Sequence, residues 1–333
     1  MDVEIFRRTV KDRRRGASWE LLQHMAEGIR ACGDNPIMVN EHKTGDWTQD
    51  EMEPTAKIGC MFGYGGSNQM HHTKGRRRDL VERAKKKGIY IITFDGGILS
   101  SFGNTITHPK HHWRVSLYSP MNNGNFLSDN SPPDRWEMMK KMWNIKYEPW
   151  RKSNPDDPIL FVLQPKDNWS MNELDPVQWF HNVYNKIRTL TKRPFLIRPH
   201  PNHMAHIEER INEFPNDCKV IIGQKFFSGD EKKYYRFNFQ EAITNCHAVL
   251  THNSTASIDS CVRGIPTFVT SDLAICWPVA NTNLEDIENP KYPDRKQWLN
   301  DLGYMLWSID EIRSGKVYSR FRSKILESNL ISL

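Results

Sequence analysis

Residues 158–201, PILFVLQPKDNWSMNELDPVQWFHNVYNKIRTLTKRPFLIRPHP, decide the fold class of this chain. The apolar run 159–163, with a proline on either side, predicts a short buried strand. The Asp-Pro pair before residue 177 predicts the capped start of a helix over 177–190, whose apolar residues recur on one side. The run 195–198 predicts the next strand. A strand, a helix and a strand in this order predict parallel pairing with a right-handed crossover.

The same alternation extends along most of the chain. Further strands are expected at 56–66, 89–97, 218–223, 247–253 and 265–271, and further helices at 76–88, 238–246 and 254–264. Two turn-rich stretches, 119–136 and 148–158, lie between the two halves. The sequence therefore predicts an α/β protein with a first domain over 1–150 and a second over 151–315. Such domains leave a cleft between two sets of strand ends.

The composition excludes a membrane protein and a disordered chain. The 333 residues are 38% hydrophobic and 11% aromatic, with a mean hydropathy of −0.68. No stretch approaches the roughly 20 apolar residues of a membrane span, and residues 1–15 lack the apolar core of a signal peptide. The six cysteines are scattered without a CxxC pair, which argues against a disulfide framework or a zinc knuckle. We expect a cytoplasmic protein, in the cytoplasm of the host cell if it is viral, and either a monomer or a dimer.

The net charge of +6 comes mostly from the first half of the chain. Residues 1–150 contain 23 basic and 18 acidic residues, a balance of +5, and residues 151–333 contain 23 and 22, a balance of +1. The basic residues cluster in short runs such as 74–78 and 110–114. Such runs favour a polyanionic partner, although each one is also compatible with an ordinary solvated surface.

Four segments follow predicted strands, where an α/β protein places its functional groups. The first, 63–68, contains glycines that allow either a tight turn or the close approach of a ligand. It matches neither the Walker nor the dinucleotide fingerprint. In the second, 94–97, Asp95 leaves a buried strand beside two glycines and acts either as a general base or as the cap of a turn.

The other two segments suit a phosphate group. Arg198 and His200, each followed by proline, form a rigid cationic pair at a strand end, with a purely structural histidine as the alternative. Segment 251–257 places hydroxyl groups at the N-terminus of a helix. There they cap the helix, bind phosphate, or do both.

An acidic-Gly segment in the first domain, followed in the second by a His-Pro pair and a Ser/Thr pair, resembles the three motifs of bacterial sialyltransferases and capsular-polysaccharide Kdo transferases. The span 63–101 and the strand end LFVLQPKDN, with its Gln164, are similar to the capsule-type enzymes. Phe94 departs from the sialyltransferases, which usually have a second acidic residue there. These families are GT-B-type glycosyltransferases that use CMP-activated sugars. The resemblance implies two Rossmann-like domains facing a central cleft and a helix over 316–333 that crosses back to the first domain.

The motifs and the resemblance together assign roles to individual residues. The resemblance implies that Asp95 is the catalytic acid/base and that His200 stabilises the leaving phosphate. The residues expected to bind the nucleotide-sugar donor are Arg198, His200, Gln164, Asn253, Ser254, Thr255 and Ser257. The residues expected to bind the acceptor are Gly65, Gly66, Ser67, Arg76, Arg77, Lys110, His111 and Arg114.

No metal or resident cofactor is expected. Glycosyl transfer needs a base near the acceptor hydroxyl, and cations or N–H groups on the departing phosphate. The chain has no DxD-like motif, and its histidine clusters at 108–112 and 200–206 lack a carboxylate or cysteine at ligand spacing. A UDP-, CMP- or GDP-linked sugar is the expected co-substrate, and the sugar is a hexose, a pentose or a Kdo/sialyl-type acid.

The basic first half favours an anionic acceptor. We expect double-stranded DNA that carries 5-hydroxymethylcytosine, as in bacteriophages that modify their genomes, and such a base must be flipped out of the duplex. The alternative acceptor is an acidic glycan of a bacterial capsule or other surface polysaccharide. Two other classes stay open: a nucleotide-sugar epimerase, and a non-enzymatic nucleic-acid-binding protein, which would need neither Asp95 nor His200.

Overall fold

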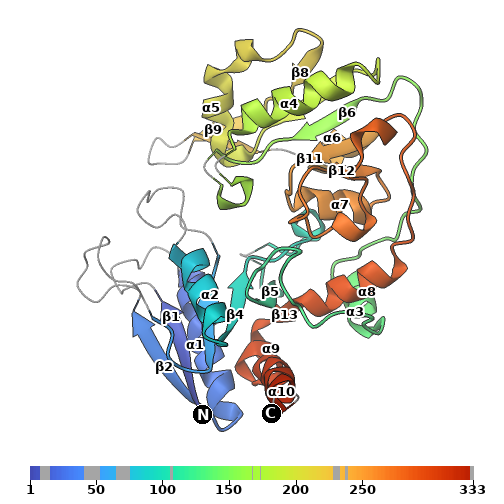
Figure 1. The fold of residues 1–333 in the computed structure, drawn as a ribbon. Coiled ribbons are helices and arrows are strands. Elements are labelled where there is room, and N and C mark those ends of the chain that lie inside the picture. The colour runs from blue at the N-terminus through green and yellow to red at the C-terminus, as the bar shows by residue number, and fades with distance from the viewer. Residues whose placement is uncertain are drawn as a thin grey trace. The chain divides into compact units, whose positions relative to one another are not determined.

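The computed structural model describes residues 1–7, 16–40, 53–64, 76–105, 108–166, 168–172, 174–227, 233–236 and 239–330. The chain divides into two compact units (Figure 1). Unit 1 comprises residues 1–139 and 300–333, and unit 2 comprises residues 140–299. Both are α/β units built on largely parallel sheets, as the alternation in the sequence predicts.

The sheet of unit 1 has the strand order β13-β5-β4-β3-β1-β2. Its strands are β1 (Asp2–Arg7), β2 (Asn35–Asn40), β3 (Ile58–Phe62), β4 (Tyr90–Asp95), β5 (His112–Leu117) and β13 (Leu306–Ser308). Strands β1 to β4 pair in parallel, whereas β5 is antiparallel to both of its neighbours. The strands expected at 56–66 and 89–97 are confirmed as β3 and β4.

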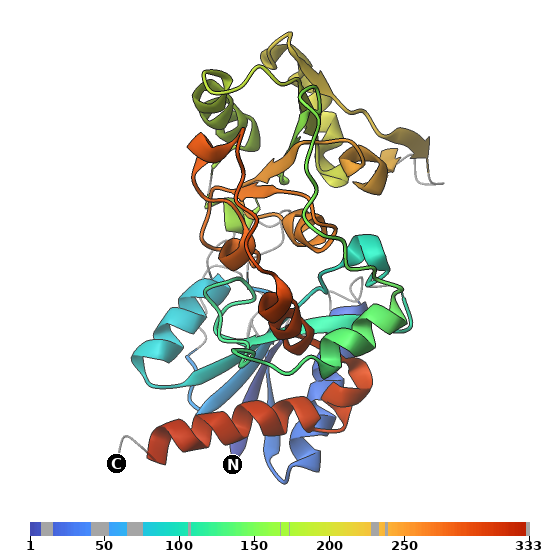
Figure 2. The ribbon, with the colours of Figure 1, turned by 90° about the vertical axis from the view of Figure 1, so that its right-hand side faces the viewer.

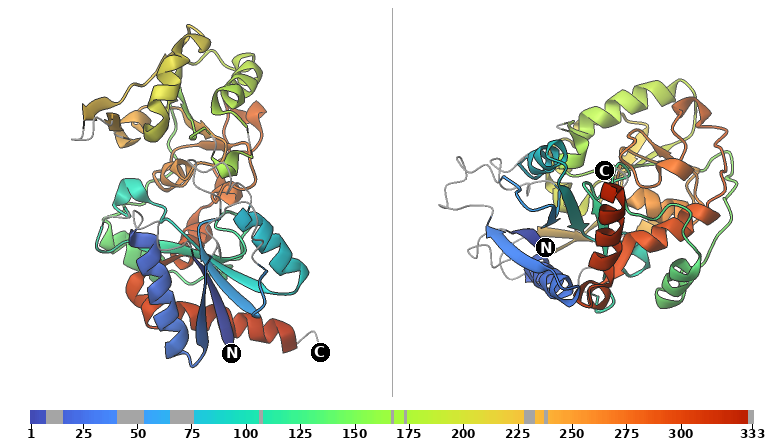
Figure 3. Two further views of the ribbon diagram at one scale, coloured as in Figure 1. Left: turned by 90° about the vertical axis from the view of Figure 1, so that its left-hand side faces the viewer. Right: turned by 60° about the horizontal axis from the view of Figure 1, so that its bottom comes forward.

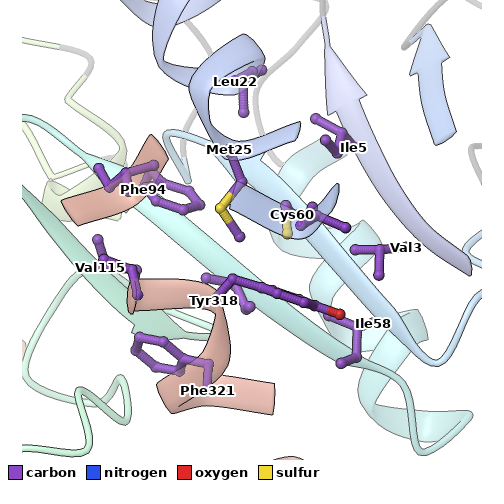
Figure 4. Close-up of a cluster of buried hydrophobic side chains, with 14 of the residues drawn as sticks. Val3, Ile5, Leu22, Met25, Ile58, Cys60, Phe94, Val115, Tyr318 and Phe321 are labelled. Atoms are coloured by element: carbon purple, nitrogen blue, oxygen red, sulfur yellow. The ribbon is translucent and has the colours of Figure 1, made fainter. Parts of the chain in front are cut away.

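Helices cover both faces of this sheet. On one face lie α1 (Gly16–Ala31), α9 (Ile309–Arg313) and α10 (Lys316–Leu330), and on the other lies α2 (Arg76–Lys86) (Figure 3). Figure 2 shows α10 lying along the sheet. In the core between the sheet and helices α1 and α10, Met25 of α1 lies beside Cys60 and Phe94 of the sheet, and Phe321 of α10 lies near Val115 (Figure 4). Burying each large apolar side chain stabilises the unit by about 1.5–3 kcal/mol.

Two partly buried ion pairs attach the C-terminal segment to the rest of unit 1. Asp34 accepts hydrogen bonds from Tyr318 Oη at 2.6 Å and Arg322 Nε at 2.7 Å. Glu311 accepts from Arg135 Nη1 at 2.6 Å and Nη2 at 3.0 Å. Burial tends to raise the pKa of Glu311, but the hydrogen bonds and charge of Arg135 outweigh it and hold that pKa at about 2. The last part of the chain is thus an integral part of unit 1.

The sheet of unit 2 is parallel throughout, with the order β12-β11-β6-β7-β8. Its strands are β6 (Ile159–Val162), β7 (Phe195–Arg198), β8 (Cys218–Val220), β11 (Ala248–Thr251) and β12 (Thr267–Val269). Helix α4 (Pro176–Arg188) packs Phe180 against Phe161 and Phe195. Asp175 caps this helix by accepting from the backbone N–H groups of residues 177 and 178. These elements confirm the strand-helix-strand order predicted from residues 158–201.

The remaining elements connect these layers. Unit 2 also contains α5 (Met204–Glu209), α6 (Phe239–Ile243), α7 (Ala256–Val262) and a hairpin of β9 (Gln224–Phe227) and β10 (Lys233–Arg236). Helices α3 (Asp134–Met142) and α8 (Lys296–Met305) carry the chain from one unit to the other. Within the described ranges, no helix has the length and apolar character needed to cross a membrane.

The sequence placed the domain boundary at residue 150, and the structure divides the chain earlier because the connecting segment packs on unit 2. Arg295 is fully buried, stacks 4.0 Å from the ring of Trp150 and donates to the carbonyl of Glu148 at 2.5 Å. Arg151 N–H donates to the carbonyl of Gly264 at 2.7 Å. Residues 300–315, which the sequence assigned to the second domain, belong to unit 1 because β13 pairs with β5.

Candidate functional site

The strand order of unit 2 contains a reversal in the direction of winding. From β6 the chain continues outward to β7 and β8, and then returns to add β11 and β12 on the other side of β6. The direction of winding therefore reverses between β6 and β11. Open α/β sheets bind ligands outside the carboxyl ends of the strands at such a reversal. The residues that follow β6 and β11 include Gln164 and Asn253, two of the predicted donor-binding residues.

Gln164 and Asn253 bind each other across this reversal. Gln164 Nε2 donates to Asn253 Oδ1 at 2.7 Å, and the backbone N–H of Asn253 donates to Gln164 Oε1 at 3.0 Å. Ser170 completes the cluster by donating to Asn253 Oδ1 at 2.9 Å and accepting from Gln164 Nε2 at 3.0 Å. All three side chains are buried. Their geometry fixes the two strand ends together, and direct contact of Gln164 or Asn253 with a donor stays a prediction.

Arg198 and His200 follow β7, the strand next to β6. Burial lowers the pKa of Arg198 to about 10, partly opposed by the charge of Asp259. Burial, with the charges of Arg198 and His203, lowers the pKa of His200 to about 4. At pH 7 the pair is therefore one cation and one neutral imidazole, not the two cations that the sequence suggested. A neutral imidazole still donates one hydrogen bond.

Asp259 is a site residue that the sequence analysis did not single out. It lies on α7 with an exposed fraction of 3%, and its charge acts on both Arg198 and Arg263. The negative charge of Asp259 favours the charged form of the Arg198 guanidinium at the strand end. One feature of the sequence could have indicated its role: Asp259 is a charged residue in segment 254–262, which is otherwise uncharged.

The hydroxyl residues before and within α7 differ in exposure. Ser257 is buried and donates to the carbonyl of Ser254 at 2.6 Å, which closes the first turn. Ser254 Oγ accepts weakly from the backbone N–H of residue 256 at 3.3 Å. Thr255 is exposed. Of the capping considered from the sequence, only the long contact of Ser254 Oγ is present: the N-cap residue of α7, Thr255, forms no side-chain capping hydrogen bond, and Ser257 donates to a carbonyl. Donor binding by Ser254, Thr255 and Ser257 stays a prediction.

In unit 1, Asp95 is the last residue of β4, and its side chain is 25% exposed. Asp95 Oδ1 accepts from the backbone N–H of Gly96 at 2.6 Å, and Oδ2 lies 3.5 Å from Arg114 Nη2. Arg114 faces Asp95 from the neighbouring antiparallel strand β5. It also donates to the carbonyls of Gly96 and Pro120, both at 2.8 Å. Arg114 thus orients the carboxylate and the chain that follows it.

A buried asparagine fixes the loop after Asp95. Asn104 Nδ2 donates to the carbonyls of Ile98 at 2.8 Å and His112 at 3.1 Å, and its Oδ1 accepts from the backbone N–H of His112 at 2.8 Å. A Cβ at Gly97 would lie 2.3 Å from Asn104 Nδ2, so only glycine fits there. Leu99 in the same loop has a φ of 68°, a conformation that costs free energy in a residue other than glycine. Asn104 was not predicted from the sequence, because no local pattern marks it.

The predicted acceptor-binding residues have different surroundings. Gly65, Gly66 and Ser67 lie outside the described residues, and Arg76 is described only as the first residue of α2. Arg77 donates to the carbonyl of Phe62 at the end of β3, next to β4. Lys110 is exposed, Arg114 is buried, and the buried ring of His111 packs edge-on against Trp113 at 4.5 Å. Burial, aided by His112, lowers the pKa of His111 to about 4. Acceptor binding by any of them stays a prediction.

Metal ligands do not gather within the part of the chain that the structure describes. There, no group of three or more His, Cys, Asp or Glu side chains is arranged to hold a metal ion.

No protein-family model and no curated protein matches this sequence. Among solved structures, the β-Kdo 2,4-transferase of Thermosulfurimonas dismutans KpsC matches with a TM-score of 0.51 and 13% identity, over 91% of this chain and 90% of that one. The β-Kdo 2,7-transferase of the same KpsC matches with a TM-score of 0.49 and 10% identity, over 96% and 100%. The UDP-GlcNAc 2-epimerase of Methanocaldococcus jannaschii matches with a TM-score of 0.35 and 11% identity, over 97% and 100%.

The KpsC match confirms, at the level of fold, the resemblance that the short motifs suggested. At 13% identity it carries no information about substrates. The two α/β units, each built on a mostly parallel sheet covered by helices, agree with the architecture expected from the sequence. The chain therefore has a GT-B-type fold of two Rossmann-like units, shared with the β-Kdo 2,4-transferase of KpsC.

Proposed function

We propose that the protein is a glycosyltransferase that moves a sugar from a nucleotide-sugar donor to a hydroxyl acceptor. The observation that carries the proposal is the set of polar groups at the winding reversal of unit 2. There, Arg198 and His200 follow a strand adjacent to the linked ends of β6 and β11. The fold shared with a sugar transferase supports the same function.

The groups of unit 2 match the demands of a departing nucleotide. As the bond between the anomeric carbon and the phosphate oxygen breaks, its electron pair moves to the phosphate, where negative charge increases. The partly buried guanidinium of Arg198 offers two parallel N–H donors to that charge. Neutral His200 donates one more hydrogen bond without needing an extra proton. Donors fixed in advance in a dry site stabilise such charge more strongly than water does.

Unit 1 supplies the base in this proposal. Asp95 would accept the proton of the acceptor hydroxyl while that oxygen bonds to the anomeric carbon. Its carboxylate is held by Gly96 N–H and lies beside Arg114, which leaves the carboxylate partly exposed to accept a proton. A well-placed general base contributes about 10²–10⁴-fold to the rate. The reaction needs no resident cofactor, because the nucleotide sugar carries the activated group.

Two anionic acceptors fit the proposal. DNA carrying 5-hydroxymethylcytosine is supported by the basic runs of the first half, and an acidic surface glycan by the resemblance of the short motifs to capsular-polysaccharide Kdo transferases. Counted by structural units, unit 1 has 25 basic and 21 acidic residues, a balance of +4, and unit 2 has 21 and 19, a balance of +2. Of the basic residues in unit 1, Arg114 and Arg135 are buried. The positive excess of unit 1, +4, is thus smaller than the +5 of residues 1–150, and it supports a DNA acceptor less strongly.

The test is a transfer assay read by mass spectrometry. The protein is incubated with a pool of UDP-, GDP- and CMP-sugars, and either hydroxymethylcytosine DNA or an acidic oligosaccharide. Asp95→Asn should lower the product by about 10²–10⁴-fold, since it removes the base but keeps the shape. Asp129→Asn is the matched control, because Asp129 is an exposed carboxylate of the same unit.

The outcome identifies both substrates. A sugar mass added to one acceptor, and lost in Asp95→Asn alone, supports transfer and names the acceptor and the donor. A donor converted to an isomer of equal mass, separated by chromatography before mass spectrometry, would indicate an epimerase instead. If no donor is consumed with either acceptor, or if Asp95→Asn is as active as the wild type, the proposed mechanism is wrong.

A further inference from the structure

His252 lies at the winding reversal but was not among the residues assigned to the site. It directly follows β11 and precedes Asn253, which is linked to Gln164 across the reversal. Its ring is half-buried and packs edge-on against Trp179 of α4, with ring centroids 6.3 Å apart. The question is which of its two nitrogen atoms carries the proton.

A chain of hydrogen bonds answers that question. Trp179 Nε1 only donates, and it lies 2.8 Å from Thr270 Oγ1. Thr270 Oγ1 also lies 2.8 Å from His252 Nδ1. The hydroxyl of Thr270 accepts from the indole and, among the described residues, forms no hydrogen bond besides these two, so we infer that it uses its own hydrogen to donate to His252 Nδ1. The neutral ring then carries its proton on Nε2.

The Nε2 atom is the free end of this chain. Within the described ranges, no side chain or carbonyl forms a hydrogen bond with His252 Nε2, and the atom is not among the buried polar atoms that lack a partner. It is therefore accessible to solvent or to a ligand. Burial lowers the pKa of His252, an effect that the charge of Asp272 opposes, so the ring is mainly neutral at pH 7. The exposed end is a hydrogen-bond donor.

We propose that His252 is a further donor-binding residue, whose Nε2–H donates to a phosphate oxygen of the nucleotide, with Thr270 and Trp179 as positioning residues that fix its tautomer. This inference rests on the proposed function, because it places the nucleotide phosphate at the same reversal. A phosphate oxygen only accepts hydrogen bonds, so an Nε2–H tautomer fits it and an unprotonated Nε2 does not. The ring plane is also fixed in advance, which lowers the entropic cost of binding.

The first measurement is the tautomer in the full-length protein, by long-range ¹H–¹⁵N correlation of the imidazole. Wild type should show the Nε2–H form at His252, and the Nε2 signal should shift when CMP, UDP or GDP binds. Thr270→Val removes the hydroxyl and should give a mixture of tautomers. A wild-type Nδ1–H form would overturn the inference.

The second measurement is the affinity for the same three nucleotides by calorimetry. His252→Ala should weaken binding of the preferred nucleotide about tenfold to one-hundredfold, as expected for a hydrogen bond to a charged group. His252→Gln places an amide N–H near the position of Nε2 and should recover most of that loss. Thr270→Val should weaken binding only a few fold. Circular dichroism of each variant confirms that the fold is kept.

Two failures can be told apart. If a nucleotide binds the wild type and His252→Ala equally well, the role of His252 is wrong, while the proposed function stands. If no nucleotide binds the wild type at millimolar concentration, the proposed function fails and takes the inference with it.

Discussion

A single methyl group at Gly97 should disrupt the loop that follows Asp95. In Gly97→Ala the new Cβ would lie 2.3 Å from Asn104 Nδ2, 2.4 Å from the His112 carbonyl and 2.8 Å from His111 Cε1. The carbonyl belongs to β5 and has little freedom to move, so the Asn104 amide must shift. Gly96→Ala is the matched control, because a Cβ at Gly96 meets nothing within 4 Å.

The magnitude follows from three contributions. Forcing a methyl group into a packed site costs about 1–3 kcal/mol. Moving Asn104 sacrifices its two donated hydrogen bonds, to Ile98 and His112, at about 1 kcal/mol each. The alanine reduces the entropy of the unfolded chain, which returns about 0.4–1 kcal/mol. We expect a loss of about 2–4.5 kcal/mol in Gly97→Ala, against about 0.5 kcal/mol or less in Gly96→Ala.

The assay is unfolding in urea, monitored by hydrogen exchange and mass spectrometry. Peptides from unit 1 report the stability of that unit independently of unit 2. Sugar transfer is measured in parallel under conditions where the variants stay folded. Displacement of the loop should lower the transfer rate of Gly97→Ala and leave that of Gly96→Ala near the wild type. The reasoning is refuted if the two variants have equal stability, or if Gly97→Ala costs less than about 1 kcal/mol.

Three further results are expected. Because Arg135 holds the pKa of Glu311 at about 2, the charged Glu311 carboxylate stabilises unit 1 fully above about pH 5, and this stabilisation is lost as the pH falls towards 2. The free energy of unfolding of Glu311→Gln should therefore depend less on pH in that range than that of the wild type. An equal pH dependence of the two proteins would contradict this expectation. The imidazole of His200 should titrate near pH 4 by NMR, and a midpoint near 6.5 would show that it is not buried as described. Gly264→Ala, where a Cβ would meet a backbone oxygen at 2.0 Å, should destabilise more in chemical unfolding than Gly33→Ala, which shares a positive φ but has open space.

The positions of the strand-end segments were predictable from the sequence because strand and helix periods are local. Short apolar runs with flanking prolines located β6 and β7, and the segments after them contain Gln164, Arg198 and His200. The motifs at these strand ends also indicated the GT-B-type fold. The periodicity of apolar residues indicates which side of a strand or helix is buried, and the direction of the chain shows which end of a strand is its carboxyl end.

The burial and the contact partners of individual side chains were not predictable in the same way. Arg114 belongs to a basic run in the sequence, yet it is buried and faces Asp95, because β5 pairs antiparallel with β4. Asn104 and Asp259 act through partners distant in sequence or on another element, so no spacing rule marks them. Charge in a sequence does not reveal whether a side chain meets solvent or a buried partner.

By itself, the sequence determined the alternating α/β elements and the chemical groups at the ends of their strands. Only the tertiary structure decided the order of the strands. That order adds residues 306–308 to the sheet of unit 1 and places Gln164 against Asn253, 89 positions away. The physical reason is that periodicity reports the burial of one element, whereas neighbours in a sheet are chosen by packing of the whole core and by backbone hydrogen bonds between distant segments.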